Sequence, residues 1–196
     1  IEKRTMTREE AEKFFEETKE DIKKSDSTFV IGVIERDGNV SDEQKRKGFV
    51  EKFSELADAD SQIKDKYRIE AVSESEYEEA VSKLKENKVR AVFITHPTIA
   101  DKISDIVFLD AEKYKDIKFC GFDSGAKQLK WLSIEKGPEF IGGVAQDSYN
   151  LGYNAVEQCI FSIQGKELKP DIKIEGHWYD KTNTDKMMQD KFIFSK

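Results

Sequence analysis

Polar side chains follow the ends of four apolar runs in this sequence, at positions where a small hydroxylated ligand can be held. Arg36 and Asp37 follow the first run, His96 follows another, and Asp123 and Gln146 come after two more. An ionised aspartate accepts two hydroxyl protons at once, whereas glutamine and histidine side chains both donate and accept hydrogen bonds. This mixture matches a sugar or other polyol, whose hydroxyl groups also do both. It does not by itself suggest a reaction.

Some of these residues also have a purely structural interpretation. The carboxylate of Asp123 could cap the helix that is expected after it, and Gln146 could be an ordinary residue at a boundary between strand and helix. Tyr149 and Tyr153 lie four residues apart on one face of a predicted helix, so their rings could stack on a sugar or pack against the protein. The sequence leaves these alternatives open.

The sequence contains no constellation that favours catalysis or metal binding. It has two histidines, His96 and His177, and no CxxC or HExxH spacing, so we expect neither a metal nor a cofactor. Ser124 lies outside any GxSxG elbow, and no glycine-rich phosphate loop is present. His96-Pro97 is most simply the end of a strand. We therefore expect a binding protein and not an enzyme.

The elements that must position these residues alternate between strand and helix. The predicted strands span residues 28–34, 67–72, 90–95, 117–122, 140–145 and 172–179. The predicted helices begin at the capping-box pattern of residues 7–10 and continue with 42–57, 74–86, 99–109, 126–135 and 147–163. This order predicts a doubly wound α/β fold with a mostly parallel sheet and helices on both faces, in which ligands bind at the carboxyl ends of the strands. Gly142-Gly143 interrupts one strand and indicates a close approach of another backbone.

Composition argues against several classes of function. The formal net charge of −7 gives no general attraction to nucleic acid. No apolar run approaches the roughly 20 residues that a membrane-spanning helix needs. Cys120 lies in a strand pattern and Cys159 on a helix face, so we expect both to be buried as small apolar residues. The chain begins at Ile1 without a visible signal peptide, so we expect a processed or partial sequence.

Two motifs resemble the type I solute-binding proteins of sugar ABC transporters, of the ribose- and galactose-binding kind. They are GFDSG at residues 121–125 and AQDxxxxGYxAVE at residues 145–157. In that family the ends of the corresponding strands contribute ligand contacts, which implies ligand contacts for Asp123 and Gln146. The family commonly has an Asn-Asp pair where this chain has His96-Pro97, and the histidine can still hydrogen-bond a hydroxyl group.

The resemblance fails at one position of the family's ligand site. The ligand-binding arginine of the family has no clear counterpart, because Glu43 lies near its place and Arg46 lies closer to the Gly-Phe pair that follows. We therefore carry no role over to either residue. The candidate ligand-binding residues of this chain are Asp123, Gln146, His96, Asp37 and Tyr149.

The resemblance also implies that the chain is one lobe of a two-lobed protein. Its order of strands and helices matches the C-terminal lobe of the family, with residues 1–146 and 165–196 as a single α/β ligand-binding lobe. Residues 147–164 then form a helix that packs, in the family, on the other lobe, which this chain lacks. The apolar stripe of that helix needs a partner, so we expect it to fold back or to dock on a second copy as a homodimer.

The function implied by the resemblance is the binding of a monosaccharide or similar polyol by lobe closure, followed by delivery to a membrane permease. The protein would then lie outside the cytoplasm, in the periplasm or as a lipoprotein at the cell surface. The ending HWYDKTNTD at residues 177–185 resembles lipoprotein members of the family. The alternatives are the effector-binding domain of a LacI-like transcription regulator, which shares this fold, and a sensory or receptor-binding lobe.

Overall fold

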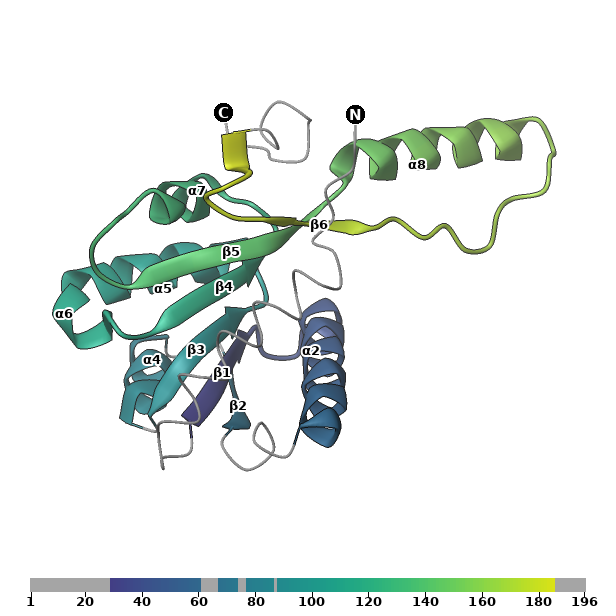
Figure 1. Ribbon diagram of the computed structural model, residues 1–196. Helices are drawn as coiled ribbons and strands as arrows, with labels where there is room; N and C mark the ends of the chain where they lie inside the picture. Colours follow the sequence, from purple (N-terminus) through teal and green to yellow (C-terminus); the bar gives the residue numbers. More distant parts are fainter. Residues whose placement is uncertain (1–28, 61–66, 74–76, 87, 186–196) are drawn as a thin grey trace.

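One mixed sheet forms the centre of the computed structural model, which describes residues 29–60, 67–73, 77–86 and 88–185. The described residues form six strands in the order β2-β1-β3-β4-β5-β6. They are β1 (Phe29–Glu35), β2 (Tyr67–Ser73), β3 (Val89–Ile94), β4 (Lys118–Phe122), β5 (Glu139–Gln146) and β6 (Gly176–Tyr179). The first five run parallel and β6 is antiparallel to β5 (Figure 1). The mostly parallel α/β fold predicted from the alternation of elements is confirmed.

Helices cover both faces of this sheet. They are α2 (Val40–Ala59), α4 (Tyr77–Glu86), α5 (Pro97–Leu109), α6 (Ala111–Tyr114), α7 (Ala126–Leu132) and α8 (Ser148–Ile163). Val92 and Ile94 of β3 belong to the buried cluster that includes α5, whereas Phe93 stacks on Phe49 of α2 with ring centroids 5.0 Å apart. Because neighbouring side chains of a strand point to opposite faces, α2 lies on the face opposite α5. The helix expected from residue 7 lies outside the described residues.

A cluster of aromatic rings lies beneath α5 and α7. Trp131 is 2% exposed, and its ring contacts those of Phe108, Phe119 and Phe140 at centroid distances of 5.7, 4.9 and 5.2 Å. Its indole N–H donates to the carbonyl of Pro138 at 2.8 Å, so its polar atom is satisfied inside the core. This cluster fixes α7 against β4 and β5, the two strands that lead into Asp123 and Gln146.

The last predicted strand is shorter than the alternating pattern of residues 172–179 suggests. Only Gly176–Tyr179 pairs with β5, and the register places Gly176 opposite Gln146, the final residue of β5. Residues before Gly176 therefore have no strand residue opposite them on β5. The predicted helix over 126–135 is shorter too, because α7 ends at Leu132.

Helix α8 extends away from the sheet and does not fold back onto it (Figure 1). None of its residues is buried among the described residues. The expectation that it folds back onto this lobe is therefore wrong for the described part of the chain. The prediction that Cys159 is buried is wrong for the same reason, whereas Cys120 in β4 is half-buried and its burial raises the pKa of the thiol to about 12. Among the described residues, no helix combines the length and the apolar character that crossing a membrane requires.

Candidate ligand-binding site

Four strands bring polar residues to one edge of the sheet. Because β1, β3, β4 and β5 are parallel, their carboxyl ends lie at the same edge, and all the predicted strand-end residues follow them there. Two of these residues are in direct contact: the side-chain amide of Gln146 donates to Oδ2 of Asp123 at 3.0 Å. The structure thus brings Asp123 and Gln146 together, as their strand ends predicted. Their part in ligand binding stays a prediction.

Asp123 does not cap the helix that follows it. Helix α7 begins at Ala126 with Gly125 as its N-cap residue, and the side-chain oxygen of Gln128 accepts the Gly125 N–H at 2.6 Å. The structural alternative for Asp123 is therefore wrong. Its carboxylate has one hydrogen bond, from Gln146 to Oδ2, and the structure records no partner for Oδ1 among the described residues. That oxygen can accept hydrogen bonds from a ligand.

His96 presents a hydrogen-bond donor at the same edge. Its Nδ1 accepts the backbone N–H of Thr98 at 3.2 Å as the N-cap of α5, and it lies 2.6 Å from the Thr98 hydroxyl. Burial and then the positive charge of Arg36 lower the pKa of the ring, which favours the neutral form. An Nδ1 that accepts a backbone N–H leaves the proton of the neutral ring on Nε2. His96 can therefore donate from Nε2 to a ligand oxygen.

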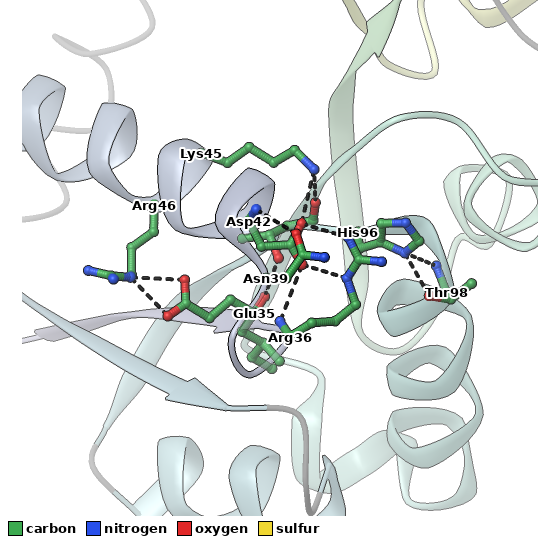
Figure 2. A network of polar contacts seen from close by, with 10 residues as sticks. Glu35, Arg36, Asn39, Asp42, Lys45, Arg46, His96 and Thr98 are labelled. Carbon is green, nitrogen blue, oxygen red and sulfur yellow. Dashed lines mark hydrogen bonds and ion pairs between the residues drawn. The ribbon is translucent and has the colours of Figure 1, made fainter.

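A buried carboxylate that the sequence analysis did not single out organises the neighbouring part of this edge (Figure 2). Asp42 is fully buried at the start of α2. Its Oδ2 accepts from Nε of Arg36 at 2.7 Å, and its Oδ1 accepts from Arg36 at 3.0 Å and from Nζ of Lys45 at 3.1 Å. Lys45 also donates to the carbonyl of Thr95 at 2.9 Å. The network ties the start of α2 to the ends of β1 and β3.

The pKa of Asp42 follows from these partners. Burial alone would raise the pKa of the carboxyl, but the hydrogen bonds and charges of Arg36 and Lys45 outweigh burial and hold it well below its ordinary value. Asp42 is therefore ionised at neutral pH. The Lys45 ammonium also lies 4.0 Å from the ring centroid of Phe122, the residue before Asp123, so the network reaches the end of β4.

Asp37, Tyr149 and Glu43 lie apart from these contacts. Asp37 is exposed in the turn after β1 and does not join the network around Asp42. Tyr149 is 53% exposed at the start of α8, where its ring stacks with that of Tyr153 at a centroid distance of 6.3 Å. Glu43 pairs with Lys47 at 3.1 Å on the surface of α2. Lys45, whose ammonium lies over the ring of Phe122, was not among the predicted site residues.

No group of three or more histidine, cysteine, aspartate or glutamate side chains in the described part of the chain is arranged to hold a metal ion. The polar groups found at the sheet edge are the carboxylate of Asp123, the carboxamide of Gln146 and the imidazole of His96, each from a different strand end. Such a set hydrogen-bonds hydroxyl groups.

Comparison with known proteins identifies solved structures that share the fold of this chain. No protein-family model matches the sequence, and no curated protein sequence matches it. Among solved structures, a protein from Brachyspira murdochii described as an ABC transporter, LacI family transcriptional regulator, superimposes with a TM-score of 0.77 at 26% identity. That alignment covers 94% of this chain and 62% of the other protein.

Two further structures have the same fold at lower identity. A carbohydrate transporter solute-binding protein from Agrobacterium radiobacter, in complex with D-arabinose, matches with a TM-score of 0.66 at 18% identity, over 90% of this chain and 59% of that one. An ABC transporter solute-binding protein from Agrobacterium vitis, bound with α-D-tagatopyranose, matches with a TM-score of 0.63 at 16% identity, over 87% and 56%. This chain therefore spans about three fifths of the length of the proteins it matches. It has the fold of the type I periplasmic binding proteins, and its structural neighbours include sugar-binding solute-binding proteins of ABC transporters.

Proposed function

We propose that this chain is a lobe of a sugar-type solute-binding protein and that it binds a monosaccharide or similar polyol at the edge that carries Asp123, Gln146 and His96. The observation that carries the proposal is the pairing of Asp123 with Gln146, which leaves Oδ1 of the carboxylate without a recorded partner. Beside it, a neutral His96 offers an N–H donor. A hydroxyl group can donate to the first and accept from the second.

The charges at this edge favour a neutral ligand over an anionic one. Arg36 and Lys45 both bond to the buried carboxylate of Asp42, and Arg46 pairs with Glu35 at the end of β1. Asp123 and the exposed Asp37 add negative charge at the same edge. Carboxylates whose charge these cations do not balance would repel an anionic ligand. They would not repel a neutral polyol.

The proposal extends to the whole protein in the way that solute-binding proteins work. Two lobes close around the sugar, and the closed form delivers it to an ABC permease. The protein then lies outside the cytoplasm, in the periplasm or anchored as a lipoprotein. Its action is binding, without catalysis. The solved neighbours described with D-arabinose and α-D-tagatopyranose support a pentose or ketohexose as the first ligands to test.

Titration with D-arabinose and D-tagatose, followed by NMR of the amide and side-chain signals, tests the binding site. We expect chemical-shift changes at Asp123, Gln146 and His96. The dissociation constants should be in the millimolar range, because a single lobe leaves exposed to solvent much of the ligand surface that a closed pocket buries. Asp123→Ala should weaken binding by about 1.5–3 kcal/mol, the usual value of a hydrogen bond to a charged group.

The control for this variant is Asp116→Ala, which removes an exposed carboxylate from the turn before β4, at the opposite edge of the sheet. It should leave binding unchanged. Shifts that appear elsewhere on the lobe, or none at all up to high sugar concentration, would argue against the site. Submicromolar binding by this chain would show that one lobe is a complete site.

A second function remains in view because one neighbour is described as a LacI family transcriptional regulator. In that case the same edge would bind an effector, and the chain would be the ligand-binding part of a regulator. The coding sequence upstream of Ile1 distinguishes the two. A signal peptide or lipobox with a second lobe supports transport, and a helix-turn-helix supports regulation.

We also propose that α8 is an interface for the second lobe of the longer protein. Five of its exposed apolar residues are spaced three or four apart and form one stripe, the α8 stripe, consisting of Tyr149, Tyr153, Val156, Ile160 and Ile163. A shallow groove runs along this helix from Ser148 to Phe161. The solved neighbours have about two fifths of their length outside the match, which is enough chain to supply a covering lobe. Exposed apolar surface of this kind is costly in water.

The α8 proposal predicts that this chain associates with itself when the second lobe is absent. In light scattering, the apparent mass of the unmodified chain should rise with concentration, and the double variant Val156→Asp/Ile160→Asp should stay monomeric. Leu109→Asp, an exposed leucine at the end of α5, is the matched control and should behave like the unmodified chain. A dimer that persists on dilution would identify a second copy as the natural occupant. A monomer at every concentration would contradict the interface.

A further inference from the structure

Asp123 has a backbone conformation that non-glycine residues seldom adopt. Its φ is +64°, and among the described residues only one other non-glycine residue, Lys88, also has a positive φ. The left-handed region brings the Cβ of a non-glycine residue too close to its own backbone. Aspartate is among the few that enter it as single residues, and contacts with neighbouring groups then stabilise the conformation. This conformation directs the carboxylate of Asp123 towards Gln146, with Oδ2 at 3.0 Å from the amide.

Two backbone contacts hold Asp123 in this conformation. Its N–H donates to the carbonyl of Val144 on β5 at 2.8 Å. Its carbonyl accepts the hydroxyl of Tyr179 at 2.6 Å. Tyr179 is the last residue of β6 and is fully buried, and burial raises the pKa of its hydroxyl, which therefore remains a donor. The two peptide groups of Asp123 are thus bonded to two different strands.

The space that the Tyr179 ring occupies is left open by a glycine. A Cβ at Gly143 would lie 2.8 Å from the Tyr179 hydroxyl and 2.9 Å from the ring, closer than carbon atoms approach in proteins. Gly143 therefore allows the ring to cross β5 and reach the end of β4. The tyrosine, the glycine and the left-handed aspartate form one arrangement across three strands.

We propose that Tyr179 is a positioning residue for the ligand contact of Asp123. Its hydroxyl holds the Asp123 peptide in the left-handed conformation and so keeps Oδ1 of the carboxylate at the sheet edge. The inference rests on the proposed function, since it assumes that Asp123 contacts the ligand. It adds a residue that does not touch the ligand and that neither the motifs nor the comparisons assign.

The test is Tyr179→Phe in this chain, with Tyr114→Phe as the matched control. Tyr114 is the other tyrosine that is buried among the described residues, and it lies in α6, away from the edge. A positive φ brings the amide and α protons of one residue close together, so Asp123 should give a strong intraresidue NOE in the unmodified chain and in Tyr114→Phe. In Tyr179→Phe that NOE should weaken, and the signals of the Gln146 side-chain amide should shift.

Binding of D-arabinose and D-tagatose is measured in the same samples. Loss of one hydrogen bond lowers the population of the competent conformer, so the affinity of Tyr179→Phe should fall roughly two- to tenfold. A change in the NOE together with a loss of affinity supports the inference. An unchanged NOE, or a changed NOE with unchanged affinity, overturns it while leaving the site itself in place.

Failure of the binding site looks different. If neither sugar perturbs the unmodified chain, the proposed function fails, and the NOE comparison still reports whether Tyr179 holds Asp123. If Tyr179→Phe does not fold, the hydroxyl proton of Tyr179 in the unmodified chain is measured instead. A buried, bonded Tyr179 hydroxyl proton should exchange slowly and show a cross-peak to Asp123 or Ser124, and the absence of that signal overturns the inference.

Discussion

Replacing Asp42 by alanine should lower the free energy of unfolding of this chain by about 3 kcal/mol, the low end for breaking a buried ion pair. The carboxylate is fully buried and bonds to two cations, Arg36 and Lys45. Its removal leaves both charges without their shared partner at a site that water reaches poorly. The low end is appropriate because the side chains of Arg36 and Lys45 are still 27% and 15% exposed and can regain some hydration. Urea unfolding followed by circular dichroism measures the change.

Glu43→Ala is the matched control for this variant. Glu43 is the next residue of α2, and it pairs with Lys47 at 3.1 Å, with both side chains about half exposed. Exposed pairs of this kind contribute at most about 1 kcal/mol, so the control should change stability little. Equal effects of the two variants would show that burial of Asp42 is not what makes its ion pairs important.

The pH dependence gives a second measure of the same group. The pKa of Asp42 is lower in the folded chain than in the unfolded one, so its contribution is complete above the ordinary value of about 4 and is lost as the pH falls through the folded value. The stability difference between the unmodified chain and Asp42→Ala should therefore be constant near neutral pH. It should shrink as the pH drops below about 4.

The sequence predicted the order of elements well because strand and helix patterns are local. The apolar run of β1 and the spaced apolar residues of α5 need no knowledge of distant contacts. The position of Asp123 beside Gln146 also followed, because parallel strands place their carboxyl ends at one edge. Gly142-Gly143 likewise marked the close approach of a neighbouring backbone, which is that of β6.

What the sequence could not show depends on contacts between distant residues. Asp42 reads as an ordinary acidic residue in the first turn of a helix, and only the packing of α2 against β1 and β3 reveals that it is buried. Asp123 has a left-handed φ, and its carbonyl accepts a hydrogen bond from Tyr179, which lies 56 residues further along the chain. The exposure of α8 depends on what lies beside it, which no periodicity records. A buried charge, a strained residue and an uncovered helix are therefore the features that required the structure.

Gly142→Ala should destabilise the chain by about 3 kcal/mol or more, because two costs add at this position. Gly142 has a φ of +144°, which an alanine adopts only with strain. An added Cβ would also lie 2.2 Å from the carbonyl oxygen of Tyr179 and 2.8 Å from the indole of Trp178. Since a backbone oxygen cannot rotate away, β6 must move off β5. Urea unfolding reports the loss of stability, and tryptophan fluorescence, to which Trp131 and Trp178 both contribute, reports the change around Trp178.

Gly152→Ala is the control for this prediction, because it makes the same substitution in the interior of α8, where no atom lies within 4 Å of the added Cβ. It should stabilise the helix by up to about 1 kcal/mol, since alanine is a better helix former than glycine. If Gly142→Ala were equally harmless, the close packing of β6 on β5 would be wrong.

The displacement of β6 expected in Gly142→Ala also affects the ligand edge, because a displaced β6 carries the Tyr179 hydroxyl away from Asp123. Gly142→Ala should therefore also weaken the intraresidue NOE of Asp123 and the response to sugar, whereas Gly152→Ala should leave both as they are.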